Sequence, residues 1–159
     1  MSSTNFQNLE KLGKLKPHEP RLHDVESSLR VGKEELQDAK RTANSLTTRY
    51  KAANDAAHGF LLIALMARGY RTTSDPGHRQ VLYELLPVLV PGATAAKDSL
   101  DRAARTRNRL IYEGSEIDIS EGMIEDVIDG AENVLEEVEM IVRKLRTDLA
   151  AKQERNSQR

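Results

Sequence analysis

Several residue types are missing or scarce in this chain of 159 residues. It has no cysteine, which excludes disulfides, thiolate nucleophiles and cysteine-ligated zinc. It has no tryptophan, and aromatic residues make up only 4% of the chain. Valine, isoleucine and tyrosine do not gather into alternating runs either, so a β-sandwich or β-barrel lacks its usual material. These absences leave a helical protein as the expected fold class.

The sequence also has no long apolar run. The stretch 60–67 is too short to cross a bilayer, which requires roughly 20 residues. No N-terminal segment has the pattern of a signal peptide. We therefore expect a cytoplasmic protein without membrane contact.

Signals for metals and cofactors are equally scarce. The spacing of His18 and His23 does not make a metal site without further ligands, and the acidic residues do not follow a calcium-loop pattern. No glycine-rich phosphate loop and no Ser-His-Asp set is present. We predict neither a metal nor a cofactor.

The formal net charge is only −1, but it is unevenly distributed. Residues 113–139 contain eleven acidic residues and no Lys or Arg, whereas residues 97–109 carry five basic residues against two acidic ones. If the two blocks are consecutive antiparallel helices, their exposed flanks attract each other, which sets register more than stability. The alternative is that both blocks are simply solvated helix faces.

What the chain does have is helical periodicity. Apolar residues recur at steps of three and four in five segments, which we expect to be helices from 24 to 41–44, 46–67, 76–89, 94 or 98 to 112, and 120–149. This pattern predicts an all-α, up-and-down bundle of about five helices, with 46–67 as the central helix. The residues expected to bound these helices are Asp24, Gly69, Asp75–Pro76, Pro91–Gly92, Gly114 and Ser120.

The predicted organisation is a flexible N-terminal arm (1–22), a helical bundle (23–150) and a polar, frayed C-terminus (151–159). The last helix also has a second apolar edge at Val127, Val134 and Ile141. This edge serves either core packing or a dimer interface.

Arg107 is the most unusual residue of the fourth helix. On a helical wheel it lies in the apolar stripe, whereas Arg102, Arg105 and Arg109 lie on the opposite side. A buried guanidinium needs a carboxylate, carbonyl groups or a bound phosphate, since it cannot discard its charge. The two interpretations are an ion pair with an acid of the last helix and a phosphate site.

The residues around Arg107 match a known pattern. Arg107 and Asn108 are followed by three residues, then Tyr112, one residue and Gly114, at the end of the fourth helix of an all-α domain. This arrangement resembles the HEPN superfamily of nucleotide-binding domains, whose members are five-helix bundles of this length. A second likeness, at 69–71 and 77–79, is to small actinobacterial-type HEPN proteins found beside nucleotidyltransferases. The resemblance spans roughly residues 24–149.

The resemblance implies a site and a partner. In active HEPN members an Arg, a polar residue and a His from two subunits form a metal-independent ribonuclease site across a homodimer; the matching positions here are Arg107, Asn108 and Tyr112. The Arg holds the scissile phosphate and the His assists proton transfer. Tyrosine, with an ordinary pKa near 10, is a poor general base at neutral pH compared with histidine near 6.5. Tyr112 can instead act as a general acid, a phosphate donor, a stacking surface or a modification site, or simply close the helix end.

Two further sets of residues complete the candidate site. His78 lies in the first turn of the third helix, where exposed backbone N–H groups attract anions, and can replace the missing His or serve as a capping residue. Arg105, Arg107 and Arg109 are candidates for binding RNA phosphates, although a pI near 6.4 makes such binding local and salt-dependent.

The function we expect from the sequence is a HEPN-like component of a toxin–antitoxin or phage-defence system. In this hypothesis the chain is a homodimeric binding partner of a nucleotidyltransferase, with a degenerate ribonuclease motif. The first alternative is an active metal-independent endoribonuclease toxin that uses Arg107, Asn108 and Tyr112. The second is a non-catalytic helical adaptor.

Overall fold

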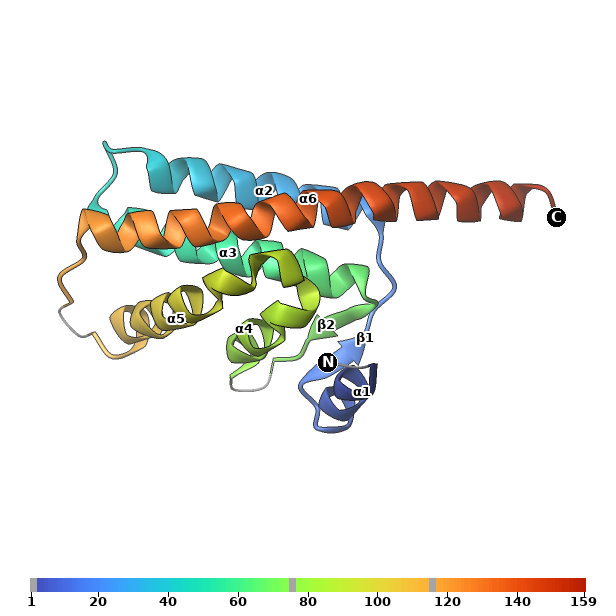
Figure 1. Ribbon diagram of the computed structural model, residues 1–159, viewed down its shortest axis with the longest axis horizontal. Coiled ribbons are helices and arrows are strands. Elements are labelled where there is room, and N and C mark those ends of the chain that lie inside the picture. Colours follow the sequence, from blue (N-terminus) through green and yellow to red (C-terminus); the bar gives the residue numbers. More distant parts are fainter. Residues whose placement is uncertain (1–2, 75–76, 115–116) are drawn as a thin grey trace.

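The computed structural model describes residues 3–74, 77–114 and 117–159 (Figure 1). This part of the chain forms six α-helices, one 3-10 helix and two short strands. In chain order they are α1 (Ser3–Lys11), β1 (Leu15–Pro17), α2 (Leu22–Lys40), α3 (Leu46–Ala67), β2 (Tyr70–Thr72), α4 (His78–Leu89), η1 (Pro91–Ala96), α5 (Lys97–Tyr112) and α6 (Glu121–Ser157). The expected helical class is confirmed, while α1 and the strand pair are additional to the five expected helices.

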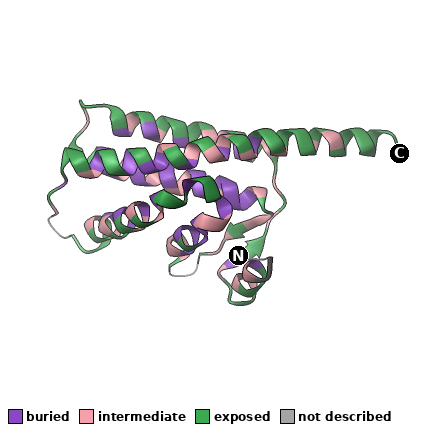
Figure 2. Cartoon of the chain, in the orientation of Figure 1, coloured by how far each residue is buried: buried purple, intermediate pink, exposed green. Residues whose placement is uncertain are grey.

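Helix α3 forms the centre of the molecule. It lies against α2 and α6, and the shorter helices α4 and α5 pack beside it (Figure 1). Its C-terminal half is apolar nearly all round, and Phe60, Leu61 and Ile63 have no exposed surface. Figure 2 shows this concentration of buried residues in the middle of the fold. The prediction that 46–67 is the central helix is confirmed.

Helices α2 and α6 are joined along their lengths by ion pairs between exposed side chains. The pairs are Lys33–Glu139 (2.9 Å), Arg146–Glu26 (2.9 Å) and Lys40–Glu132. The acidic half of α6 therefore faces lysines of α2. Between α5 and α6 the described residues form no ion pair, so the expected attraction between those two charged blocks is not what aligns them.

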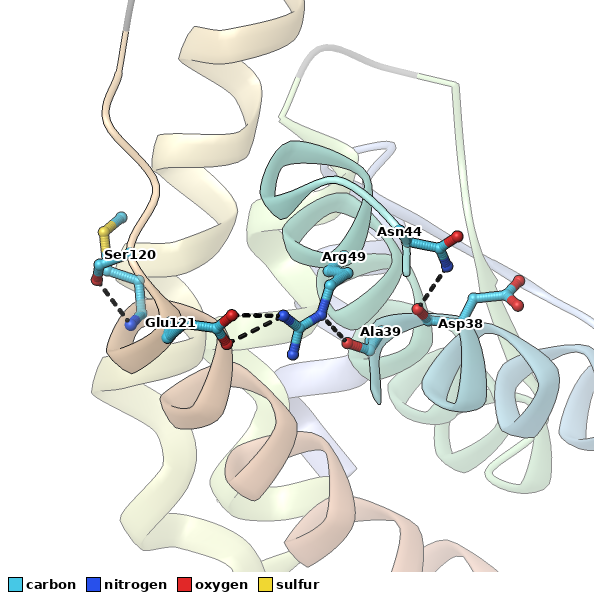
Figure 3. A network of polar contacts seen from close by, with 7 residues as sticks. Asp38, Ala39, Asn44, Arg49, Ser120 and Glu121 are labelled. Carbon is cyan, nitrogen blue, oxygen red and sulfur yellow. Dashed lines mark hydrogen bonds and ion pairs between the residues drawn. The ribbon is translucent and has the colours of Figure 1, made fainter. Parts of the chain in front are cut away.

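One end of the bundle is fastened by Arg49, whose side chain is only 5% exposed (Figure 3). Its Nε donates to the carbonyl of Ala39 in α2 at 2.8 Å, and its Nη1 contacts both carboxylate oxygens of Glu121 in α6 at 2.9 and 3.0 Å. Next to Glu121, the Ser120 hydroxyl accepts from the backbone N–H of Met123 at 3.1 Å and caps α6 as expected. A single guanidinium thus links three helices.

Most helix ends lie where the sequence predicts them, but α2 begins at Leu22 with Arg21 at its N-cap, so the expected cap Asp24 lies inside its first turn. Gly69 and Gly114 both adopt left-handed backbone conformations, with φ of 87° and 60°, directly after α3 and α5. The expected cap at Asp75–Pro76 lies outside the described residues, and α4 begins after Gly77. The proline-glycine pair at 91–92 ends α4 by starting η1.

The N-terminal segment, which the sequence suggested as an arm, contacts the rest of the fold through Phe6 and β1. Strand β1 pairs antiparallel with β2, so that Lys16 lies opposite Arg71. Phe6 of α1 is 5% exposed and stacks on Tyr70 with ring centroids 5.4 Å apart. At the other terminus, α6 continues as a helix to Ser157, where a frayed end was expected from 151, and its last turns extend beyond the other helices (Figure 1).

The second apolar edge of α6 serves the core. Val127 and Val134 are 2% and 0% exposed within this single chain, and Ile141 is half-buried against the core. The core-packing interpretation of this edge is therefore the one that the structure supports. None of the described helices is both long and apolar enough to cross a membrane.

Candidate functional site

Helix α5 carries the motif residues, and its arginines lie on two different faces of the helix. Arg107 is 9% exposed and lies in the buried stripe with Leu100 and Ala104. Arg105 and Arg109 are exposed on the outer face, as is Arg102. The prediction that Arg107 alone points inwards is confirmed.

The partner of Arg107 is Asp55 of the central helix. Nη2 of Arg107 lies 2.9 Å from Oδ1 of Asp55, and Nη1 of Arg79, at the start of α4, lies 3.4 Å from the same oxygen. One carboxylate oxygen is thus shared by two guanidinium groups. We call Asp55, Arg79 and Arg107 the carboxylate bridge. The expected acid from the last helix is not involved.

This bridge satisfies the charge of Arg107 inside the fold. The Arg107 side chain is 11% exposed, whereas Asp55 is 34% exposed, so the carboxylate lies at the solvent edge with the guanidinium behind it. Nε of Arg107 is buried and has no hydrogen-bond partner. An arginine held in this way does not reach a phosphate unless Asp55 gives up its position.

A cleft of about 550 Å³ lies between the start of α4 and the C-terminal half of α5. It is lined by three of the residues singled out from the sequence, His78, Asn108 and Tyr112, together with Arg79. Arg107 does not line it. The structure therefore brings His78 to Asn108 and Tyr112, but places the motif arginine behind the wall of the cleft.

The character of the cleft suits an anion. Among the described residues that line it, Arg79 is a cation and none is acidic. The first turn of α4 also borders it, where backbone N–H groups at a helix start favour negative charge. Asn108 is half-buried, and no hydrogen bond of its side chain occurs within the described residues.

Two buried aromatic groups, Tyr83 in the wall of the cleft and His58 of α3 outside it, are held in their neutral forms. Burial raises the pKa of Tyr83, at the floor of the cleft, to about 12. Burial, assisted by the positive charge of Arg79, lowers the pKa of His58 to about 3. Both groups are therefore neutral near pH 7.

Tyr112 is the most exposed of the candidate residues. It is 79% exposed at the end of α5, with no hydrogen bond or ring contact to the rest of the described chain. It therefore does not close the helix end over the core. Its ring and hydroxyl are free to meet a ligand or a second molecule.

The three arginines suggested for phosphate binding do not converge. Arg105 pairs with Asp101 at 3.4 Å and Arg109 with Glu113, just after α5, at 3.7 Å; both arginine side chains are exposed. Arg107 lies on the opposite face. Arg105 and Arg109 can still contact a large ligand on the outer face of α5, but not one that also touches Arg107.

Sequence reasoning missed Asp55 and undervalued Arg79. Asp55 is the only acidic residue in the 22 residues of α3, and a single carboxylate in the central helix is the signal that would have found it. Arg79 was part of a recognised pattern at 77–79, but no role followed from its position in the sequence.

The described residues contain no group of three or more His, Asp or Glu side chains that can hold a metal ion. Comparison of the chain with protein-family models, with curated proteins and with solved structures finds no match. The function must therefore be argued from the site itself.

Proposed function

We propose that this protein is a HEPN-like component of a toxin–antitoxin or phage-defence system that binds without cleaving RNA. It works as a homodimeric partner of a nucleotidyltransferase, with a degenerate ribonuclease motif. The single observation that carries the non-cleaving role is the carboxylate bridge, because it holds Arg107 inside the fold, paired with Asp55 at 2.9 Å.

The position of Tyr112 supports the same role. Proton transfer in catalysis needs a group of suitable pKa held within hydrogen-bond reach of the reacting atom. Tyr112 stands where the family motif has its histidine, but it is 79% exposed, and no side chain of the described residues forms a hydrogen bond that would orient it. A large exposed aromatic side chain is better suited to a contact with another molecule.

The cleft beside Tyr112 supports binding of an anionic surface. Arg79 and the first turn of α4 supply positive charge, and Asn108 supplies an uncommitted amide. Phosphate groups of RNA, or of a nucleotide held by the partner enzyme, match this chemistry. Such contacts position a ligand but do not by themselves break a phosphodiester.

The experiment that tests this proposal is an RNA-cleavage assay. Purified protein is incubated with labelled tRNA or mRNA in the presence of EDTA, beside an Arg107→Ala variant. We expect intact RNA in both samples. Fragments produced by the wild type and lost in Arg107→Ala would overturn the non-cleaving role. Asn108→Ala, at a residue that lines the cleft, serves as a second variant.

The second candidate function is an active metal-independent endoribonuclease. The specific observation in its favour is that His78 lies in one cleft with Asn108 and Tyr112, where it can supply the histidine that the motif lacks. This reading requires Arg107 to leave Asp55. It predicts cleavage that is also lost in a His78→Ala variant, which the non-cleaving role does not.

A non-catalytic adaptor without RNA contact is the remaining alternative. A complete ion pair of Arg107 with an acid of the last helix would have favoured it. The actual partner belongs to α3, and Nε of Arg107 is left without a hydrogen bond. Failure of the protein to bind either RNA or a nucleotidyltransferase would favour this alternative.

A further inference from the structure

A second pocket, of about 440 Å³, lies between α2 and α3 on the other side of Arg79 from the cleft. Helix α2 contributes Ser27, Ser28 and Glu35 to its wall, α3 contributes Asp55, His58 and Gly59, and α4 contributes Arg79. This volume falls within the range of roughly 300–1,000 Å³ typical of small-molecule sites. We call it the α2–α3 pocket.

The pocket owes its open space to Gly59. This glycine lies inside α3, where glycine weakens a helix relative to alanine, and its backbone has no positive φ that would call for glycine. A Cβ added at Gly59 would meet no atom within 4 Å. Neither the backbone conformation nor the packing requires a glycine at position 59. The absence of a side chain there keeps the pocket open.

Glu35 is the chemically unsatisfied group in the wall. Its carboxylate is half-buried and takes part in no hydrogen bond or ion pair within the described residues. Burial raises the pKa of Glu35, and the negative charge of Asp55 raises it further, ahead of the opposing effect of Arg79. The neighbouring charges therefore leave a negative potential at this carboxylate, which a cation would relieve.

The rest of the wall is suited to a cation that has an apolar stem. Nε2 of His58 is buried without a partner, and burial keeps this ring neutral so that it does not repel positive charge. The hydroxyls of Ser27 and Ser28 are further acceptors. Val31, which is 43% exposed, and Leu62 give the pocket an aliphatic side.

We propose that the α2–α3 pocket binds an organic cation, an ammonium or guanidinium group on a short aliphatic chain, with Glu35 as its counter-ion and the Val31–Leu62 side against its stem. Arg79 also lines the pocket, but its ion pair is with Asp55, and Asp55 and Glu35 together outnumber this one cation in the wall. The same chemistry is offered by a free alkylamine and by a lysine or arginine side chain of a bound polypeptide. This site shares Arg79 with the cleft of the proposed RNA contact, but the binding of a cation here does not require RNA to be bound.

The test is a titration of the full-length protein with butylguanidinium, followed by calorimetry and by amide chemical shifts in NMR. The neutral analogue 1-butanol is the ligand control. Glu35→Gln removes the counter-ion, and Gly59→Leu fills the pocket from a position with open space around it. Glu34→Gln, an adjacent and exposed glutamate already paired with Arg30, is the matched control.

We expect butylguanidinium to bind the wild type and Glu34→Gln equally and to shift amides of α2 and α3. Glu35→Gln should weaken binding by about tenfold or more, as expected when a charge-assisted contact is lost, and Gly59→Leu should abolish it. Blocked arginine (N-acetyl-arginine methylamide) distinguishes the sources: binding by it supports a polypeptide side chain, and binding by butylguanidinium alone supports a free amine. No saturable binding of either cation at millimolar concentration, or equal binding by Glu35→Gln, would overturn the proposal.

Discussion

The carboxylate bridge predicts that removing Asp55 costs more stability than removing Arg107, although each change breaks the same ion pair. Asp55→Ala leaves two guanidinium groups without a carboxylate, and one of them, Arg107, is 11% exposed and has little access to water. Arg107→Met removes the buried charge and keeps its aliphatic bulk. Asp55 then still has Arg79 at 3.4 Å and its own solvent contact.

The expected magnitudes follow from this asymmetry. Removing one partner of a fully buried ion pair costs about 3–5 kcal/mol, and replacing the whole pair by apolar side chains is often neutral. Because Asp55 is 34% exposed, water can partly replace its carboxylate, so we expect Asp55→Ala to cost about 2–3 kcal/mol. Arg107→Met should cost less than about 1 kcal/mol.

The assay is urea unfolding followed by far-ultraviolet circular dichroism, since the chain has no tryptophan to report by fluorescence. The Asp55→Ala/Arg107→Met double variant closes the cycle. It should be more stable than the sum of the single effects predicts, by about 1–2 kcal/mol, since no stranded Arg107 remains. If Arg107→Met costs as much as Asp55→Ala, or if the effects are additive, the described role of Asp55 is wrong.

Three further predictions concern single positions in the bundle. Gly59→Ala should raise the free energy of unfolding by about 0.5–1 kcal/mol through helix propensity, since the new methyl group meets nothing within 4 Å; unchanged or reduced stability in urea would contradict this. Gly130→Ala should instead lower it by about 1–3 kcal/mol, because its Cβ would lie 2.9 Å from Cδ2 of Leu100; a neutral effect in the same assay would refute the close packing of α5 on α6. The pKa of His58 is about 3 in the folded protein, whereas the ordinary pKa of histidine is 6.5. Below pH 6.5 the unfolded chain therefore binds a proton at His58 that the folded chain does not bind. Relative to His58→Gln, the wild type should lose about 2 kcal/mol of unfolding free energy by pH 5. Parallel pH profiles of the two proteins would show that His58 is not held neutral by the fold.

Much of the fold could be predicted from the sequence because helices obey local rules. The positions of Gly69, Gly114 and Ser120 at helix ends follow from backbone conformation and capping, which involve only near neighbours. The strand pair could not be found in this way. Leu15–Pro17 and Tyr70–Thr72 are three residues each, too short to show alternation, and their pairing depends on contacts over more than fifty positions of the chain.

The candidate site could likewise be predicted only where local rules apply. Periodicity placed Arg107 on the inner face of α5, and charge burial required it to have a partner. A helical wheel shows which face of a helix a residue occupies, but not which neighbouring helix that face meets. The sequence therefore suggested a partner for Arg107 in the last helix, where acidic residues are abundant, whereas the actual partner is Asp55 in the central helix.

Our central proposal is that Arg107, paired with Asp55 inside the fold, does not take part in cutting RNA. The most direct test follows the cleavage of end-labelled RNA over time, in the presence of EDTA, by the purified wild-type protein and by the Arg107→Ala variant. The account predicts full-length RNA throughout in both samples. Cleavage by the wild type that disappears with Arg107→Ala would contradict it.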